Sequence, residues 1–176
     1  MFQPMPPIAS FAPEQTIYIS SLSKTVSPGL RTAFVCVPDR FHEKLVTALY
    51  SMNISISPLL ATVSAALIED GVADEIIAER QRGIRERNLI VNKILDGFVM
   101  LGGLTAPLRY LQLPEHFTGK SFEICARQAG VEVYGAERFS VGNRLPEKAV
   151  RISVTSPPSL EVLTDGLERL RDLLRQ

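Results

Sequence analysis

The chain has 176 residues, of which 45% are apolar and 22% are charged, and its formal net charge is zero. This composition is typical of a globular protein with a sizeable core, made of one domain or of one domain and part of another. Because basic and acidic residues are equal in number, the composition indicates no strongly basic surface, and we expect no direct nucleic-acid contact by this chain. No apolar run is long enough to span a membrane and no signal peptide is visible, so we predict a cytoplasmic location without membrane contact.

The first half of the chain predicts loops, two strands and three helices. Residues 1–16 are proline-rich without periodicity, which predicts a loop or linker. Two short apolar runs with β-branched and aromatic residues predict buried strands at 17–20 and 32–37. Apolar residues at helical spacing then predict helices over 39–52, 57–70 and 73–95, with Gly71 ending the second of them. We assign residues 17–97 to the end of a larger domain.

The pattern changes after Gly97 to alternating short segments. Strands are predicted at 98–101, 108–113, 131–134 and 149–154, and helices at 118–128 and 159–174. Residues 98–176 therefore read as a small α+β domain, and the chain as a whole as α/β. The two cysteines, Cys36 and Cys125, have no CxxC or metal-ligand neighbours, so we predict two buried free thiols and no metal site.

One lysine lies in a serine-rich connection between the two predicted strands of the first half. The hydroxyl groups around Lys24 could hold an anion, and Arg31 could bind it with two hydrogen bonds. A lysine amine beside a phosphate site is one way to build a Schiff-base centre. The alternative is that both side chains are ordinary solvated charges, because Ser-x-x-Lys alone is a weak motif.

The order of residues around Lys24 resembles a known family. The segment "SLSKTVSPGLR" (residues 21–31) is similar to the lysine segment of fold-type I enzymes that use pyridoxal 5'-phosphate, the aminotransferase class I and II superfamily. The stretch "IEDGVAD" resembles the MocR branch of the GntR-type transcriptional regulators within that superfamily. Three later segments, "LGGLTAPLRYLQLPE", "AGVEVYGAERFS" and "AVRISV", look in order like the small domain of the same fold. The likeness covers nearly the whole chain, and several consistent segments in the correct order are more specific than any one.

The resemblance implies a role for each matching residue. Lys24 matches the lysine that condenses with the cofactor and later moves protons at the substrate's α-carbon. Ser21 and Arg31 match the groups that hold the cofactor phosphate, and Ser23 is a further candidate. Arg151 matches the arginine that binds the substrate α-carboxylate, and its alternative reading is a surface arginine on a strand. A neutral lysine amine would be favoured by burial beside Arg31. Arg109 and Arg138 receive no role.

The sequence also departs from the family pattern. In the family, the aspartate that pairs with the pyridine nitrogen, the aromatic residue on the ring and the first phosphate-binding turn lie upstream of the lysine, and here the lysine is residue 24. We therefore expect the chain to be the C-terminal part of this fold. The regulators would also carry an N-terminal winged helix-turn-helix, which would supply DNA binding.

The resemblance leaves the function open among three classes. The first is the effector domain of a MocR-type regulator, which would bind pyridoxal phosphate and an amino acid or amino compound as its signal. The second is a true aminotransferase that acts on an amino acid, and the third is an inactive fragment. Lys24, Ser21 and Arg31 serve the first two classes equally. The resemblance further implies a homodimer.

Overall fold

The computed structural model describes residues 6–53, 55–142 and 147–176, and it confirms the α/β class. The chain forms two compact units, Met1–Glu79 and Arg80–Gln176. Their boundary lies inside helix α4 (Val72–Ile94). The domain ranges 17–97 and 98–176, which follow the change of pattern at Gly97, stay a prediction.

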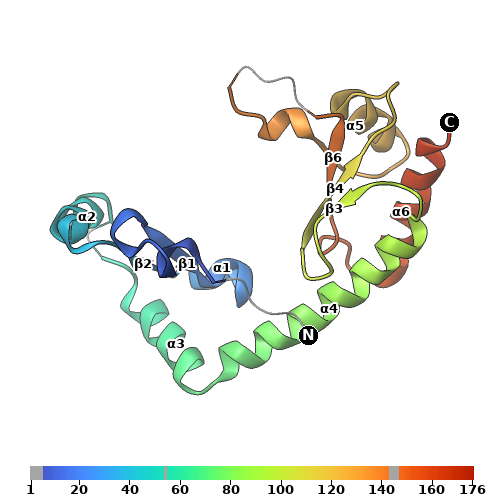
Figure 1. The fold of residues 1–176 in the computed structure, drawn as a ribbon. Helices are drawn as coiled ribbons and strands as arrows, with labels where there is room; N and C mark the ends of the chain where they lie inside the picture. Colours follow the sequence, from blue (N-terminus) through green and yellow to red (C-terminus); the bar gives the residue numbers. More distant parts are fainter. Residues whose placement is uncertain (1–5, 54, 143–146) are drawn as a thin grey trace. The chain divides into compact units, whose positions relative to one another are not determined.

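The first unit contains a two-stranded antiparallel sheet and mostly helical segments around it. Strands β1 (Tyr18–Ser21) and β2 (Ala33–Cys36) pair with Tyr18 opposite Cys36 and Ser21 opposite Ala33. The other elements of the unit, coloured blue to green in Figure 1, are η1 (Ile8–Ser10), η2 (Pro13–Gln15), α1 (Leu22–Thr25), η3 (Pro28–Leu30), α2 (Asp39–Asn53), α3 (Pro58–Glu69) and the first part of α4. Helix α1 and η3 form the connection between the two strands.

A small core fixes this connection. Val26, Leu30 and Ala73 are buried, and Leu22, Leu67 and Ile76 pack against them. The buried Ser64 hydroxyl of α3 donates to the Thr32 hydroxyl at 3.1 Å, and Thr32 in turn donates to the Leu30 carbonyl at 2.9 Å. Helix α3 is therefore tied to the residues that immediately precede β2.

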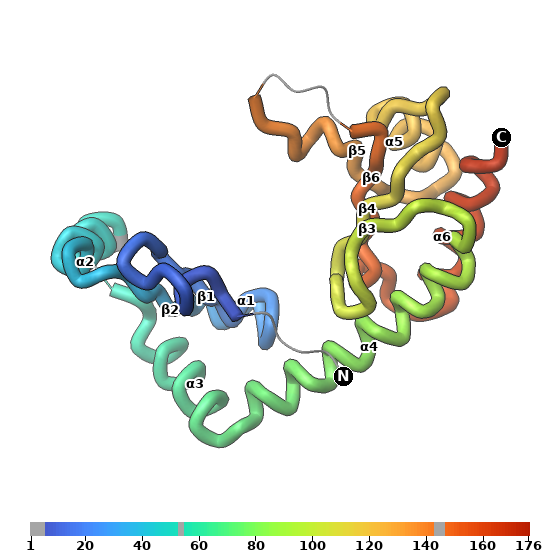
Figure 2. The backbone as a smooth tube through the Cα atoms, viewed as in Figure 1, coloured from blue at the N-terminus to red at the C-terminus, as the bar shows by residue number. Residues whose placement is uncertain are grey.

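The second unit is a four-stranded antiparallel sheet in the order β3-β4-β6-β5. Figure 2 shows β4 and β6 side by side, with the chain passing through a helix between them. The bounds are β3 (Met100–Leu101), β4 (Leu108–Gln112), α5 (Gly119–Gln128), β5 (Tyr134–Gly135), η4 (Ala136–Phe139), β6 (Ala149–Ser153) and α6 (Leu160–Leu174). Thr118 and Ser121 form a reciprocal capping box that starts α5, and the Ser159 hydroxyl accepts from Val162 N–H at the start of α6.

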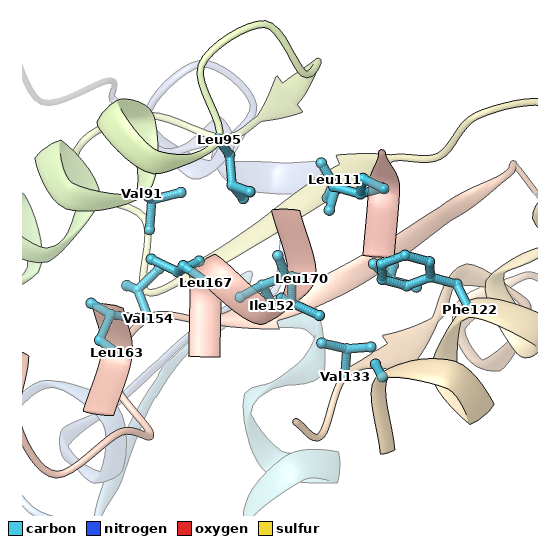
Figure 3. Close-up of a cluster of buried hydrophobic side chains, with 13 residues drawn as sticks. Val91, Leu95, Leu111, Phe122, Val133, Ile152, Val154, Leu163, Leu167 and Leu170 are labelled. Carbon is cyan, nitrogen blue, oxygen red and sulfur yellow. The ribbon is translucent and has the colours of Figure 1, made fainter. Parts of the chain in front are cut away.

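One face of this sheet carries the main core. The buried side chains come from the end of α4, from β4 and β6, from α5 and α6, and from the loop that follows α5. Figure 3 draws this cluster as sticks. Phe122, Leu111 and Val150 are fully buried, and Leu163, Leu167, Leu170 and Leu174 cover them from α6. Because side chains alternate along a strand, burial of Leu111 and Val150 places Tyr110 and Arg151 on the opposite, open face.

The structure confirms the predicted helices and shortens several strands. The prediction that the strands at 17–20 and 32–37 are buried is wrong, because β1 and β2 are mostly exposed. The strand expected at 131–134 begins only at Tyr134. Val131 and Val133 belong to the loop after α5, where they pack in the core and form no strand pairing. The strand expected at 98–101 forms only at Met100 and Leu101. Both cysteines are free, but the prediction of burial is wrong for Cys36, which is exposed on β2, and Cys125 is only half-buried. No helix among the described residues is long and apolar enough to cross a membrane.

Candidate functional site

The lysine segment, which the sequence placed in a connection between strands, forms a short helix. Strand β1 ends at Ser21, whose hydroxyl accepts from the Ser23 N–H at 3.1 Å and so caps α1. Lys24 lies in this four-residue helix and is exposed, so the expected burial of its amine is not found. The Leu22 N–H donates to the Thr32 carbonyl at 3.1 Å and holds the start of α1 against the end of the connection.

Arg31 follows η3 in a left-handed backbone conformation, with a φ of 48°. This region is costly for a residue with a side chain, by about 1–2 kcal/mol, and such residues gather at functional sites. The neighbouring Leu30 and Thr32 are buried and hold the backbone in place. Within the described parts of the chain, the Arg31 guanidinium is exposed and makes no hydrogen bond or ion pair. The first unit thus brings Ser21, Ser23, Lys24 and Arg31 onto one connection between paired strands.

The last predicted site residue, Arg151, belongs to the second unit. It lies in the middle of β6 on the open face of the sheet, directly opposite Tyr110 of β4 and Tyr134 of β5. Its guanidinium carbon lies 4.1 Å from the ring centroid of Phe139 and 5.5 Å from that of Tyr134. Phe139 also meets Tyr110 edge-on, with 6.3 Å between ring centroids. The Arg151 guanidinium therefore lies against two aromatic rings, and the ring of Tyr110 meets one of them.

These aromatic neighbours were not identified from the sequence. Phe139 arrives from η4, a separate 3-10 helix that no periodicity in the sequence predicts. Residues opposite each other on paired antiparallel strands share a face, so the pairing of the strands identifies Tyr110 and Tyr134 as neighbours of Arg151. That inference needs the register, and the register depends on contacts distant in sequence.

A carboxylate from α5 holds the segment that carries Phe139. Glu123 accepts from the Arg138 guanidinium through both carboxylate oxygens, at 3.1 Å from Nε and 2.5 Å from Nη2. The buried Gly135 N–H and the Arg127 guanidinium, each at 3.1 Å, complete its hydrogen bonds. The Glu123 side chain is 10% exposed. Arg138, which received no role from the sequence, is thus the half-exposed partner of a nearly buried carboxylate.

This pair makes a testable contribution to acid stability. The hydrogen bond from Arg138, and next that from Gly135 N–H, lowers the pKa of Glu123 below its ordinary value of 4.5. The folded protein therefore gains stability from Glu123 that is fully present above pH 4.5 and is lost as pH falls through the lowered pKa. We expect Glu123→Gln to flatten the dependence of the unfolding free energy on pH below 4.5, measured by chemical denaturation at several pH values. An unchanged slope would contradict the assignment.

A second arginine without a predicted role is structural. Arg109 is 4% exposed on the core face of β4, and burial lowers the pKa of its guanidinium. It donates to the side-chain oxygens of Asn88 at 2.8 Å and Asn92 at 3.3 Å, and to the Leu101 carbonyl at 3.2 Å. The Asn88 amide in turn donates to the Ile84, Leu104 and Ala106 carbonyls. This network joins α4 to the sheet from the side opposite Arg151.

Comparison with known proteins extends the resemblance seen in the sequence. The model of the family "Aminotransferase class I and II" matches residues 2–170. An uncharacterized HTH-type transcriptional regulator, YdeF of Bacillus subtilis, is 47% identical over 171 residues, which are 97% of this chain and 37% of the relative. The aromatic-amino-acid aminotransferase 1 of Thermococcus litoralis is 24% identical over 180 residues, covering 99% of this chain and 43% of the enzyme.

The fold is also that of solved aminotransferases. The multiple substrate aminotransferase of Thermococcus profundus superposes with a TM-score of 0.84 over 99% of this chain and 44% of its own length, at 23% identity. The chain therefore spans less than half the length of each of these relatives. The predicted fold is confirmed.

Proposed function

This chain belongs to the aminotransferase class I and II family, and we propose that it is part of a pyridoxal 5'-phosphate-binding effector domain in a MocR-type transcriptional regulator of the GntR group. The observation that carries the proposal is the connection between β1 and β2, where Lys24 follows two serines and Arg31 is held in a left-handed conformation. The 47% identity to an HTH-type regulator supports the regulatory branch. DNA binding is assigned to a separate winged helix-turn-helix of the whole protein.

The residues of this connection fit the cofactor that the family implies. Arg31 presents a guanidinium that bonds to no other described group, as a phosphate-binding arginine must. Ser21 donates to the Thr32 carbonyl at 3.4 Å, which is long for a hydroxyl donor, so its proton can turn to a phosphate oxygen at little cost. Ser23 lies half-buried beside it at the start of α1. We assign Ser21, Ser23 and Arg31 to the phosphate.

Lys24 is assigned to the covalent chemistry of the site. When bound, pyridoxal phosphate supplies an aldehyde that condenses with amines and a ring that withdraws electrons from the carbon next to the amine. The Lys24 amine would be the nucleophile toward that aldehyde, in its unprotonated form. When an amino compound is bound in the site, the same amine would be the group that takes or returns a proton at the α-carbon.

Arg151 is assigned to the carboxylate of the amino-acid effector. A guanidinium binds a carboxylate with two parallel hydrogen bonds, and the rings of Tyr134 and Phe139 orient the Arg151 guanidinium. The whole protein is proposed to be a cytoplasmic homodimer, as the family resemblance implies. Its effector is an amino acid or a related amino compound.

A second candidate function is turnover as an aminotransferase. It is favoured by the match to an aromatic-amino-acid aminotransferase over 99% of this chain, and by a lysine that serves both classes equally. Conversion of a keto acid to an amino acid by the full-length protein, at a rate that sustains many turnovers, would favour the enzyme over the regulator. An inactive fragment is the third alternative, and absence of cofactor binding would favour it.

The location of the cofactor tests the proposal. We expect the full-length protein, incubated with pyridoxal phosphate and then reduced with borohydride, to carry one added phosphopyridoxyl group per chain. Peptide mapping by mass spectrometry should place it on the peptide that contains Lys24. A label spread over exposed lysines such as Lys44 and Lys120 in proportion to their accessibility would contradict a specific site.

A further inference from the structure

Two guanidinium groups lie against one aromatic ring on the open face of the second unit. The Arg138 guanidinium carbon is 5.1 Å from the Tyr134 ring centroid, and that of Arg151 is 5.5 Å from the same centroid. A ligand carboxylate bound to Arg151 would therefore lie near a second cation. Two cations close together suit a ligand with two carboxylates, whereas one cation among aromatic rings suits a ligand with one carboxylate and an apolar remainder.

The charge of Arg138 is already compensated within the protein. Glu123 accepts from it through both carboxylate oxygens, and this pairing raises the pKa of Arg138 and lowers the pKa of Glu123. The Gly135 N–H holds the same carboxylate from the backbone of β5. Since the Glu123 side chain is only 10% exposed, water competes weakly for it.

Arg151 has no such partner. In the parts of the chain that the structure describes, no carboxylate lies within salt-bridge distance of its guanidinium, whose contacts are the rings of Phe139 and Tyr134. The open face thus carries one neutralised guanidinium and one uncompensated guanidinium beside the same ring.

We propose that Glu123 determines the specificity of the Arg151 site. By neutralising Arg138 from the core side, Glu123 leaves a single cation on the open face, so the site selects ligands with one carboxylate and an apolar remainder over dicarboxylates. This inference rests on the proposed function, because it takes Arg151 as the carboxylate-binding residue. Glu123 acts through Arg138 and Gly135 and does not touch the ligand.

The test compares two probes of equal carbon number, pentanoate and pentanedioate, on the full-length protein loaded with pyridoxal phosphate. Their dissociation constants are measured by calorimetry at constant ionic strength, and the ratio of the two affinities is the readout. We expect Glu123→Gln to raise the affinity for pentanedioate relative to pentanoate roughly three- to tenfold, because it exposes the charge of Arg138 to the second carboxylate. The effect is limited because the Arg138 side chain is half exposed and solvent screens its charge.

The converse variant gives a prediction of opposite sign. Arg138→Gln leaves the Glu123 carboxylate with the exposed Arg127 as its remaining cationic partner. The relative affinity for pentanedioate should therefore fall severalfold. The double variant Glu123→Gln/Arg138→Gln restores neutrality and should return the ratio to the wild-type value. Glu115→Gln removes the same charge from an exposed pair with Lys148 and is the matched control, expected to leave the ratio unchanged.

The outcomes separate this inference from the proposed function. A purely structural Glu123 would weaken both probes equally and leave the ratio unchanged in both single variants, which would overturn the inference. If Glu123→Gln fails to fold, as judged by circular dichroism, the Arg138→Gln variant still tests the inference, because its relative affinity for pentanedioate should fall. Arg151→Gln should weaken both probes at least tenfold, and unchanged affinities in that variant would instead overturn the carboxylate role proposed for Arg151.

Discussion

Lys24→Ala is expected to abolish covalent attachment of pyridoxal phosphate to the full-length protein. The variant removes the amine that attacks the aldehyde, and no other lysine lies on the connection between β1 and β2. Ser21, Ser23 and Arg31 remain, so the phosphate should still bind, but only reversibly. Borohydride reduction followed by intact-mass measurement should show the added group in the wild-type protein and its loss in the variant.

The matched control for this experiment is Lys44→Ala. Lys44 is also exposed and lies on α2 of the same unit, so its loss changes the net charge equally. It should leave the labelled fraction unchanged. Equal labelling of the Lys24→Ala protein at a single other position would show that a different lysine carries the chemistry and would remove Lys24 from the role.

Phe122→Ala is expected to be the most destabilising single change considered in the second unit. Phe122 is fully buried, meets Phe117 edge-on with 5.1 Å between ring centroids, and lies beside Val133 in the core of Figure 3. Removing the ring of a buried phenylalanine costs about 3–5 kcal/mol, because both transfer energy and packing are lost. Amide hydrogen exchange of β4 and β6 in the native protein should report this loss as a faster exchange of their most protected amides.

Ile124→Ala on the same helix is the control for this prediction. Its side chain is half exposed, so we expect a loss below about 1 kcal/mol and little change in exchange. Equal losses of stability in the two variants would contradict the assignment of Phe122 to the core and of Ile124 to the surface of α5.

Much of the fold follows from patterns that are local in the sequence. The leucines of α6 recur at helical spacing, and the structure buries the same face of that helix that the spacing predicts. Gly71 ends α3 with a positive φ of 76°, which glycine adopts without strain. The strands of the second half were found in order, although the short strand near residue 134 was predicted too early. The ends of a strand depend on the neighbouring strand that forms backbone hydrogen bonds with it, and the local sequence does not identify that neighbour.

At the candidate sites too, some features follow from the local sequence and others only from the tertiary structure. Ser21, Ser23, Lys24 and Arg31 lie within eleven consecutive residues, so the sequence alone determined that they share one segment, and the resemblance to a family assigned their roles. Whether those roles hold is the subject of the labelling experiments. Only the tertiary structure showed that Arg31 adopts a left-handed backbone and that Thr32, anchored by Ser64 of α3, holds the connection closed.

Around Arg151 the sequence determined much less. It identified the arginine and its strand, because the motif and the alternation of apolar residues are both local. The register of β4, β5 and β6 decided that Tyr110 and Tyr134 flank it, and the packing of α5 decided that Glu123 neutralises Arg138. These contacts join residues up to 41 positions apart, as between Tyr110 and Arg151. These contacts require that the strands of the sheet pair and that α5 packs Phe122 against them. Burial of the shared core offsets the conformational entropy that is lost when segments distant in the sequence become ordered.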